Sequence, residues 1–504
     1  MTPDPGPPRP SDPSTRPSRR DTGLLLCGAV LIALLLLEPL LRLPLHVPLN
    51  YNEGWNAYFD SRAAGLDAGA LYPSDGLVFN NYPPLSFYLV GALGRTVVGD
   101  MIVAGRIVAM ASLLASAALV GLCVRHLGGT TRASLAAWGL LLLFAATFFR
   151  EYVAMDDPQW LAHALMLGGL AVLLRHQTEG RFPTRRLVAA ALLVAAGGFV
   201  KHSLVGLPLA VTLWLALVRP RAAATWLAAA LGWVAAGLLA TALLHGPEAF
   251  ASVLGHRRVF QAARLARALG GLAPLLPMLG VAVLACRRWR RPADPSMLFA
   301  ALFVAISLAT GIVQRLGEGV NFNAHFEALA ALCLATGLAV SRAGAAEPAT
   351  RGRAPAPGPA ALAVLAAIPA LALAPWTLAR SWDQAAGSLA RARSWEPMVA
   401  RIRAAPGLAG CEMPSLCFWA GKPFSVDQFN LKQSVATGQP IARFDTLART
   451  QAFGAFEYGR DAYVRATMPG PHARDPLLVD LLARGYAVVE TGPDGAVLLG
   501  PPGG

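Results

Sequence analysis

Residues 50–88 read NYNEGWNAYFDSRAAGLDAGALYPSDGLVFNNYPPLSFY and separate the first long apolar segment of the chain from the next one. This stretch is polar, aromatic and acidic, within a chain that consists mostly of Ala, Leu and Val. Glu53 lies just beyond the first apolar segment, and residues 80–85 (NNYPPL) lead into the next. A carboxylate at a membrane surface beside a proline-stiffened loop indicates a functional site.

The composition is that of a multi-pass membrane protein. Of 504 residues, 55% are hydrophobic and 14% are charged, and the mean hydropathy is +0.48. The net charge of +14 comes from arginines in short segments between apolar runs, which is a pattern of membrane topology. Basic patches interleaved with aromatic residues are absent from the sequence, so we expect no nucleic-acid partner.

The apolar pattern predicts about eleven transmembrane helices in a domain that covers residues 23–380. Residues 1–22 are rich in Pro, Arg and Ser and predict a disordered cytoplasmic tail. The first span is expected at 23–45, and a first periplasmic loop at 46–99. The other spans are expected at 100–124, 132–150, 157–176, 185–200, 203–218, 222–244, 268–286, 296–314, 321–342 and 359–378.

This arrangement satisfies the positive-inside rule if the apolar segment 83–98 dips into the outer interface without crossing. The loops at 125–132, 175–186, 219–221, 286–291 and 342–353 then all carry arginine on the cytoplasmic side. We therefore expect a protein of the bacterial inner membrane with a cytoplasmic N-terminus.

The same topology collects polar groups at the outer face: Glu53, Asp156 with Asp157, Lys201 with His202, and the segment 318–327. Ionisable groups at a membrane boundary are costly, so a one-sided cluster predicts a functional site. Glu53 and Asp156 are candidates either to accept a proton or to bind a divalent cation. Asp157 precedes Pro158 and has the alternative role of a helix N-cap.

Several outer residues are candidate binding groups, each with a structural alternative. Lys201, the sole lysine of the membrane part, and His202 are placed to meet a phosphate, whereas snorkelling would explain the lysine equally. The segment 248–268 predicts an amphipathic surface helix that presents Arg257 and Arg258 to anionic lipid, or simply anchors at the interface. Further candidates for the substrate pocket are Asn52, Trp55, Glu318, Asn321, Asn323 and His325.

The order of these elements resembles the GT-C superfamily of membrane glycosyltransferases. The acidic first loop, the YPPL stretch, the DDP site, the later lysine and the helix start at 317–323 resemble protein O-mannosyltransferases, aminoarabinose transferases and rhizobial lipopolysaccharide transferases, over about residues 23–345. That group carries an Asp-Glu pair in the first loop, where this chain has Asn52-Glu53.

The resemblance implies an inverting transfer of a sugar from a polyprenyl-phosphate donor to a periplasmic glycan, lipid or protein. Glu53, helped by Asp156, is then expected to activate the acceptor hydroxyl, with Asp157 beside them, while Lys201 and outer arginines bind the lipid phosphate. The group Tyr82, Pro83, Pro84 would shape the lipid groove. A divalent cation is an open option at Glu53 and Asp156, and the sugar, acceptor and lipid length stay undetermined.

Residues 381–504 predict a small α/β domain on the periplasmic side. The segment 479–500 indicates a helix and two strands that are joined at 492–495. Cys411 and Cys417 are candidates for a disulfide in an oxidising compartment. The segment 418–430 is expected to be either a plain turn or a contact to the acceptor or the membrane cavity.

Two other classes of protein compete with the transferase. A transporter or lipid flippase would show paired halves and charged or broken helices at mid-membrane; the sequence has no internal repeat, and Glu38-Pro39 is the main feature in favour of this class. A non-catalytic membrane scaffold would not need the outer acidic cluster.

Overall fold

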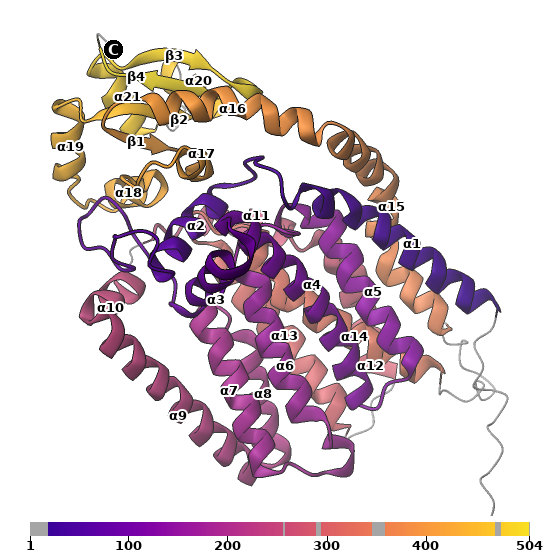
Figure 1. Cartoon of the computed structure of the whole chain (residues 1–504). Helices are drawn as coiled ribbons and strands as arrows, with labels where there is room; N and C mark the ends of the chain where they lie inside the picture. The colour runs from indigo at the N-terminus through magenta and orange to yellow at the C-terminus, as the bar shows by residue number, and fades with distance from the viewer. Residues whose placement is uncertain (1–18, 256–257, 289–293, 345–357, 469–474, 503–504) are drawn as a thin grey trace, which may run out of the picture.

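The computed structural model describes residues 19–255, 258–288, 294–344, 358–468 and 475–502. A helical bundle carries a smaller domain at one end, formed by the C-terminal part of the chain (Figure 1). The expected class, a polytopic helical membrane protein with a small C-terminal α/β domain, is confirmed.

Eight helical segments in the described residues are long and apolar enough to cross a membrane. They lie at 22–42, 101–126, 131–148, 220–245, 262–287, 295–315, 322–344 and 359–386. Three of the eleven predicted spans form shorter helices instead, with 16, 17 and 13 residues: α6 (Gln159–Leu174), α7 (Thr184–Val200) and α8 (Gly206–Val218). The remaining helices of the bundle are α1 (Arg19–Arg42), α4 (Met101–His126), α5 (Thr131–Phe148), α9 (Pro220–His245), α12 (Leu276–Arg288), α13 (Pro295–Arg315), α14 (Phe326–Gly344) and α15 (Pro359–Ala386).

Helix α14 forms the centre of the bundle. Its membrane segment is buried along its whole length, whereas α9 lies at the periphery and few of its residues are buried (Figure 1). In a bilayer these exposed leucines and valines would face lipid. Glu38 of α1, the feature that a transporter could use, forms ion pairs with Arg42 at 3.0 Å and with Arg150 at 2.6 Å.

The first loop folds into α2 (Tyr51–Ala63), then a long irregular segment, then α3 (Leu85–Leu93) and a π-helical turn (Gly94–Val98). Asn50 caps α2, because its side chain accepts a hydrogen bond from the N–H of Asn52. Helix α3 is too short to cross a bilayer. This fits the prediction that 83–98 does not span the membrane.

The segment predicted as one amphipathic helix at 248–268 is broken, so that prediction is wrong. It contains α10 (Pro247–Leu254), a 3-10 turn (Ala262–Arg264) and α11 (Leu265–Gly270). Between them Phe260 forms an isolated β-bridge with Gly317, and the N–H of Gln261 donates to the carbonyl of Leu316 at 3.1 Å. These contacts with residues 316–317, which are distant in the sequence, hold the backbone extended where the apolar periodicity alone favours a helix.

The C-terminal domain contains a four-stranded sheet in the order β1-β2-β4-β3. Strands β1 and β2 are parallel and the other two pairs are antiparallel, which confirms the predicted hairpin of β3 and β4. Helix α15 extends to Ala386, past the predicted domain boundary at 380. The elements are α16 (Ser388–Ala404), β1 (Leu408–Cys411), α17 (Pro414–Trp419), α18 (Gln428–Ala436), α19 (Ala442–Arg449), β2 (Phe453–Tyr458), α20 (Arg460–Thr467), α21 (Pro476–Ala483), β3 (Ala487–Thr491) and β4 (Val497–Gly500).

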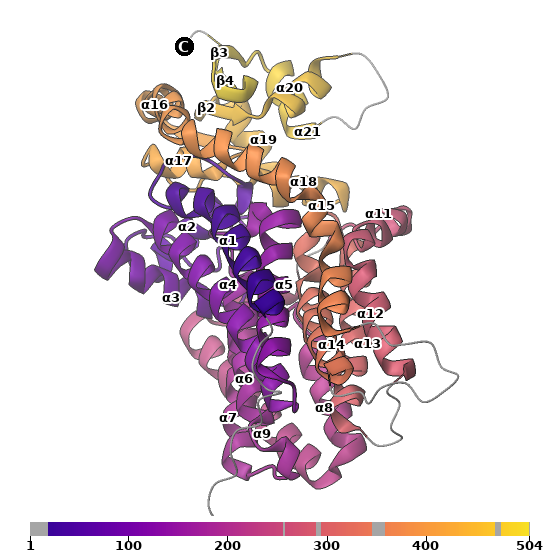
Figure 2. The same ribbon diagram turned by 90° about the vertical axis from the view of Figure 1, so that its right-hand side faces the viewer.

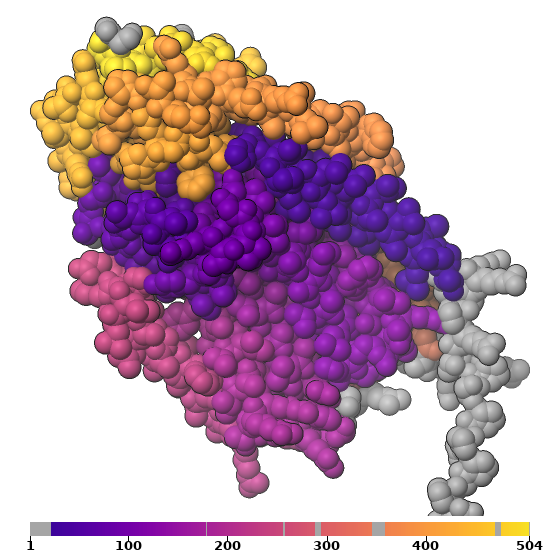
Figure 3. Space-filling view, viewed as in Figure 1, coloured from indigo at the N-terminus to yellow at the C-terminus, as the bar shows by residue number. Residues whose placement is uncertain are grey.

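The C-terminal domain packs directly on the first loop (Figures 2 and 3). A Cβ atom at Gly54 of α2 would lie 2.0 Å from the backbone nitrogen of Ser415 in α17, so only glycine permits this approach. Cys411 at the end of β1 and Cys417 within α17 are joined by a disulfide. The disulfide therefore fixes the segment on which α2 rests.

Candidate active site

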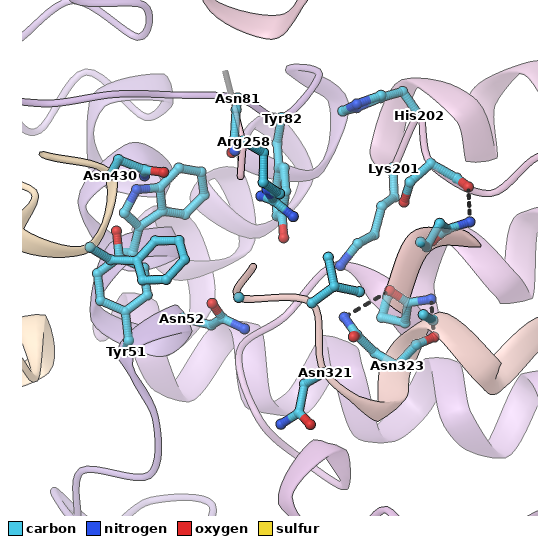
Figure 4. A pocket seen from close by; sticks show the side chains of 18 of the residues that line it. Tyr51, Asn52, Asn81, Tyr82, Lys201, His202, Arg258, Asn321, Asn323 and Asn430 are labelled. Carbon is cyan, nitrogen blue, oxygen red and sulfur yellow. Dashed lines mark hydrogen bonds between the residues drawn. The ribbon is translucent and has the colours of Figure 1, made fainter. Parts of the chain in front are cut away.

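A cavity of about 470 Å³ lies where one end of the helical bundle, the first loop and the C-terminal domain meet. It is open on one side and is lined by aromatic, basic and carboxamide side chains (Figure 4). The sequence-predicted residues among its lining are Asn52, Trp55, Tyr82, Lys201, His202, Arg258, Asn321 and Asn323.

The basic side of the cavity is built around Lys201, in the tight turn between α7 and α8. Its Nζ lies 3.3 Å from Oδ1 of Asp157 and 4.9 Å from the ring centre of Tyr82. Burial lowers the pKa of Lys201, but the Asp157 carboxylate and Tyr82 outweigh it and leave the pKa above its ordinary value. Lys201 is 5% exposed, so it is a buried cation and does not snorkel.

His202 and Arg258 add to the same side of the cavity (Figure 4). Burial, followed by repulsion from Lys201 and Arg258, lowers the pKa of His202, so its imidazole is neutral at pH 7. The permanent positive charge on this wall therefore comes from Lys201 and Arg258. Such a pair matches a phosphate group.

Asp157 holds the acidic position next to the cavity. Its Oδ2 accepts a hydrogen bond from Nδ2 of Asn52 at 3.1 Å, and its Oδ1 accepts one from the N–H of Gln159 at 2.8 Å. The capping role is therefore present at the start of α6, together with the ion pair to Lys201. Asp157 does not itself line the cavity, but two of its partners, Asn52 and Lys201, do.

Carboxamides form much of the remaining wall. The side chains of Gln159 and Asn323 face each other, with Nδ2 of Asn323 3.4 Å from Oε1 of Gln159, and Nε2 of Gln159 donates to the carbonyl of Asn323 at 3.2 Å. This pair joins α6 to the segment before α14. Amides both donate and accept hydrogen bonds, which suits the hydroxyl groups of a sugar. The lining carboxamides are Asn50, Asn52, Asn81, Gln159, Gln314, Asn321, Asn323 and Asn430.

The C-terminal domain supplies the roof of the cavity through Phe429 and Asn430. The ring of Phe429 lies 5.5 Å from that of Tyr51, and Asn430 is held by Asp427, to which its Nδ2 donates at 2.6 Å. Of the two interpretations of residues 418–430, the structure supports the contact with the membrane cavity.

Asp427 joins the roof to the first loop. It is fully buried and accepts hydrogen bonds from Oη of Tyr51 at 2.5 Å and from Nε1 of Trp55 at 3.1 Å. Burial raises the pKa of Asp427 in spite of these donors. The roof is therefore tied to α2 by a buried polar contact.

Glu53 and Asp156 lie side by side, since the N–H of Asp156 donates to Oε1 of Glu53 at 3.3 Å, but neither lines the cavity. Glu53 is completely buried, and its two oxygens receive Nε and Nη2 of Arg106 at 2.7 and 2.8 Å. The expectation that Asp156 points into the outer cavity is wrong, because it is 3% exposed and faces a small internal void. A carboxylate saturated by arginine is poorly placed to take a proton from an acceptor.

Four other predicted residues lie outside the cavity lining. Pro83 and Pro84 precede α3 and support Tyr82 without reaching the cavity. Glu318 pairs with Arg264 at 3.6 Å, and His325 is fully buried beside Gly311. Arg257 lies outside the described residues.

The sequence reasoning missed Gln159, Gln314, Phe429 and Asn430 as cavity residues, and it missed Arg106 as the partner of Glu53. It found three of the lining carboxamides, Asn52, Asn321 and Asn323, but not the others. The density of Asn in the loops at 50–52, 80–81 and 321–323 was the available signal. For Arg106 the signal was a lone arginine in an apolar span.

Comparison with solved structures defines the fold. The chain superposes on ArnT from Cupriavidus metallidurans in the apo state with a TM-score of 0.61 at 13% identity, covering 95% of this chain and 98% of that one. The same protein bound to undecaprenyl phosphate gives 0.60, with the same identity and coverage. The archaeal oligosaccharyltransferase AglB from Archaeoglobus fulgidus, in complex with an inhibitory peptide and a dolichol-phosphate, gives 0.51 at 12% identity over 96% of this chain and 75% of that one.

These likenesses show that the chain shares the fold of both proteins, which is the GT-C-like fold that the sequence predicts. A scan against protein-family models finds no matching model, and a search of curated proteins finds no matching sequence.

Proposed function

We propose that the protein is a membrane glycosyltransferase that moves a sugar from a polyprenyl-phosphate carrier to an acceptor hydroxyl on a glycan, lipid or protein. The observation that carries the proposal is the cavity, which joins a basic side at Lys201 and Arg258 to a wall of amides and aromatic rings. The basic side suits the phosphate of the donor, and the amide wall suits the sugar. The GT-C fold supports the proposal, and one structural neighbour was solved with undecaprenyl phosphate.

In the proposed reaction the acceptor oxygen attacks the anomeric carbon as the bond from that carbon to the phosphate oxygen breaks. Attack from the opposite side gives inversion. The polyprenyl phosphate leaves with both bonding electrons, and Lys201 stabilises the added charge. The acceptor proton passes to Asp157, whose carboxylate is held at the cavity edge by Asn52 and Lys201. Glu53 and Arg106 keep α2 in place behind this wall.

The outward orientation is part of the proposal. Arg125, Arg175 and Arg219 lie at the C-terminal ends of α4, α6 and α8, whereas the cavity is lined by the turn between α7 and α8. The disulfide of Cys411 and Cys417 suits an oxidising compartment. We infer that the cavity and the C-terminal domain face the periplasm of a bacterial inner membrane. Alkaline phosphatase fused after residue 502 should then be active, and fused within 126–131 it should be inactive; the reverse result would exclude this orientation.

The activity test uses membranes that contain the full-length protein and polyprenyl-phosphate sugars as donors. Asp157→Asn should lower the transfer rate by roughly 10²–10⁴-fold while the protein stays folded. Asp461→Asn, an exposed carboxylate of the C-terminal domain, is the matched control and should transfer at the wild-type rate. Full turnover by the Asp157 variant would refute its role as the base. Absence of transfer with every lipid-linked donor would refute the proposed function.

A further inference from the structure

Glu327 is a buried carboxyl group that the proposed reaction does not use. It lies in the first turn of α14, is 3% exposed and does not line the cavity. Burial of a carboxyl group is costly unless hydrogen bonds satisfy its oxygens. The partners of Glu327 therefore indicate what the residue does.

Both oxygens of Glu327 accept hydrogen bonds from the backbone at the start of α8. The N–H of Gly206 donates to Oε2 at 3.0 Å, and the N–H of Leu207 donates to Oε1 at 3.0 Å. The first N–H groups of a helix have no partner within the helix, and a carboxylate is favourable beside them. Val205 precedes α8 and provides no side-chain cap, so Glu327 supplies from α14 the cap that α8 lacks.

The close approach of α8 to its neighbours depends on a glycine. A Cβ atom at Gly206 would lie 2.9 Å from Oε2 of Glu327 and 2.8 Å from Oγ of Ser307 in α13. A larger residue at this position would push the carboxyl group away from the helix. The start of α8 is therefore fixed against both α13 and α14.

The fixed end of α8 is also the end of the turn that carries Lys201. Only four residues separate Lys201 from Gly206. At the other end of the turn, the N–H of Lys201 donates to the carbonyl of Gly197 in α7 at 2.9 Å. In its middle, Nε2 of Gln314 in α13 donates to the carbonyl of Ser203 at 2.8 Å. A shift at the start of α8 must therefore be absorbed within this short turn.

We propose that Glu327 is a positioning residue for Lys201. Lys201 and His202 lie together on the basic side of the cavity (Figure 4). By holding the start of α8, Glu327 keeps the turn in the conformation that presents Nζ of Lys201 to a phosphate. The inference rests on the proposed function for the identity of that phosphate, which is the head group of the polyprenyl carrier.

Glu327→Gln is the variant that tests this role. It keeps nearly the same side-chain volume but replaces one accepting oxygen with an NH₂ group, which only donates hydrogen bonds. One N–H of α8 then loses its partner and faces a second donor. The start of α8 should move away from α14, and the turn before it should lose its fixed conformation.

The measurement is the affinity of the detergent-solubilised full-length protein for undecaprenyl phosphate, by tryptophan quenching. Glu327→Gln should weaken binding by roughly 3- to 10-fold and should raise hydrogen–deuterium exchange of the backbone at 202–207. Asp294→Asn is the matched control, because Asp294 caps α13 by accepting the N–H of Ser296 at 3.0 Å, at the helix end remote from Gln314. It should also lower stability but keep the wild-type affinity.

Gly206→Ala provides a second test if Glu327→Gln does not fold. It disturbs the same contact from the side of α8 and keeps the carboxyl group. We expect a loss of affinity of the same order, because the added Cβ atom would lie 2.9 Å from Oε2 of Glu327.

A double-mutant cycle separates positioning of Lys201 from a general loss of structure. In the Lys201→Ala background, Glu327→Gln should change the affinity by less than about twofold, because the group that it positions is already gone. The inference is overturned if Glu327→Gln binds the lipid as tightly as the wild type, or if its loss is equally large in the Lys201→Ala background. Absence of lipid binding by the wild type would refute the donor in the proposed function, and this inference with it.

Discussion

The first loop and the C-terminal domain each bury one glutamate completely, but they neutralise it in different ways. Glu53 of α2 receives two hydrogen bonds from Arg106. Glu457 of β2 accepts the N–H of Met413 at 2.9 Å, its other oxygen has no partner in the described chain, and no cation pairs with it there. Burial, and then the nearby Glu412, raise the pKa of Glu457 to about 8, although the N–H of Met413 lowers it.

The difference shows that burial alone does not decide the protonation state of a carboxyl group. With a guanidinium beside it, Glu53 is a buried anion that fixes the position of α2. Without one, Glu457 holds its proton at neutral pH. Neither glutamate lines the cavity.

Removal of one member of the ion pair should have the largest effect. Glu53→Ala leaves the buried Arg106 cation without its charged partner, although it still donates to the carbonyls of Leu45 and Val47. We expect a loss of about 3–5 kcal/mol in the free energy of unfolding. Chemical unfolding of the purified protein measures this loss. Glu396→Ala, on the exposed face of α16, is the control and should change stability by less than about 0.5 kcal/mol.

The same variant separates the two roles of Glu53. Glu53→Ala could unfold at the same denaturant concentration as the wild type and still lose transfer activity. That result would mean that Glu53 acts in the chemistry, and the interpretation of Glu53 and Glu457 as two structural glutamates would be wrong. Full stability would also mean that Arg106 finds another partner. A destabilised protein with residual activity in proportion to its folded fraction supports the structural role.

The sequence predicted the helical membrane class and the position of the site better than the roles of single residues. Apolar run lengths identify spans, and Asn52, Tyr82 and Lys201 were found because they are polar where the chain is otherwise apolar. The roles of Asp156 and Asp157 could not be told apart from the sequence, because these neighbours differ only in their long-range partners: Asp157 contacts Lys201 and Asn52, whereas Asp156 contacts Glu53. The position of Asp156 also depends on the room left by Gly105, in another helix.

The sequence also does not reveal partners that lie far apart in the chain. Arg106 is 53 residues from Glu53, and Asp427 is 376 residues from Tyr51. No local pattern encodes such pairs, because they exist only after the helices and the C-terminal domain have packed.

The next effect in size concerns binding at the cavity. Lys201→Ala removes the buried cation beside Asp157, and we expect a loss of about 10- to 100-fold in affinity for a polyprenyl phosphate, from the usual strength of a hydrogen bond to a charged group. Binding of undecaprenyl phosphate to the detergent-solubilised protein, by tryptophan quenching, measures it. Lys432→Ala, in which a lysine of the C-terminal domain paired with Asp475 is lost, should keep full affinity.

The Lys201→Ala variant extends the comparison to a buried charged group at the cavity. Lys201 has a charged partner, as Glu53 does, but unlike Glu53 it lines the cavity. Unchanged lipid affinity in Lys201→Ala would place the phosphate elsewhere in the cavity, with Arg258 as the remaining candidate.

The smallest expected effect, counted per pH unit, is the pH dependence of stability that Glu457 imposes on the C-terminal domain. The pKa of Glu457 rises from about 4.5 in the unfolded chain to about 8 in the folded one. Between these values the unfolded state releases a proton that the folded state keeps. The stabilising proton is therefore fully present below pH 4.5, and stability falls as the pH rises toward 8, by up to about 1.4 kcal/mol per pH unit.

Glu457→Gln keeps the shape and removes the titration, so its stability should be nearly flat over the same range. Urea unfolding of the full-length protein between pH 5 and 8, followed by tryptophan fluorescence, measures the slope. Glu490→Gln, on β3, is the control and should retain the wild-type slope. Equal slopes in Glu457→Gln and the wild type would show that the buried glutamate is charged. A cation near β2 would then have to compensate it, and the contrast with the arginine-paired Glu53 would disappear.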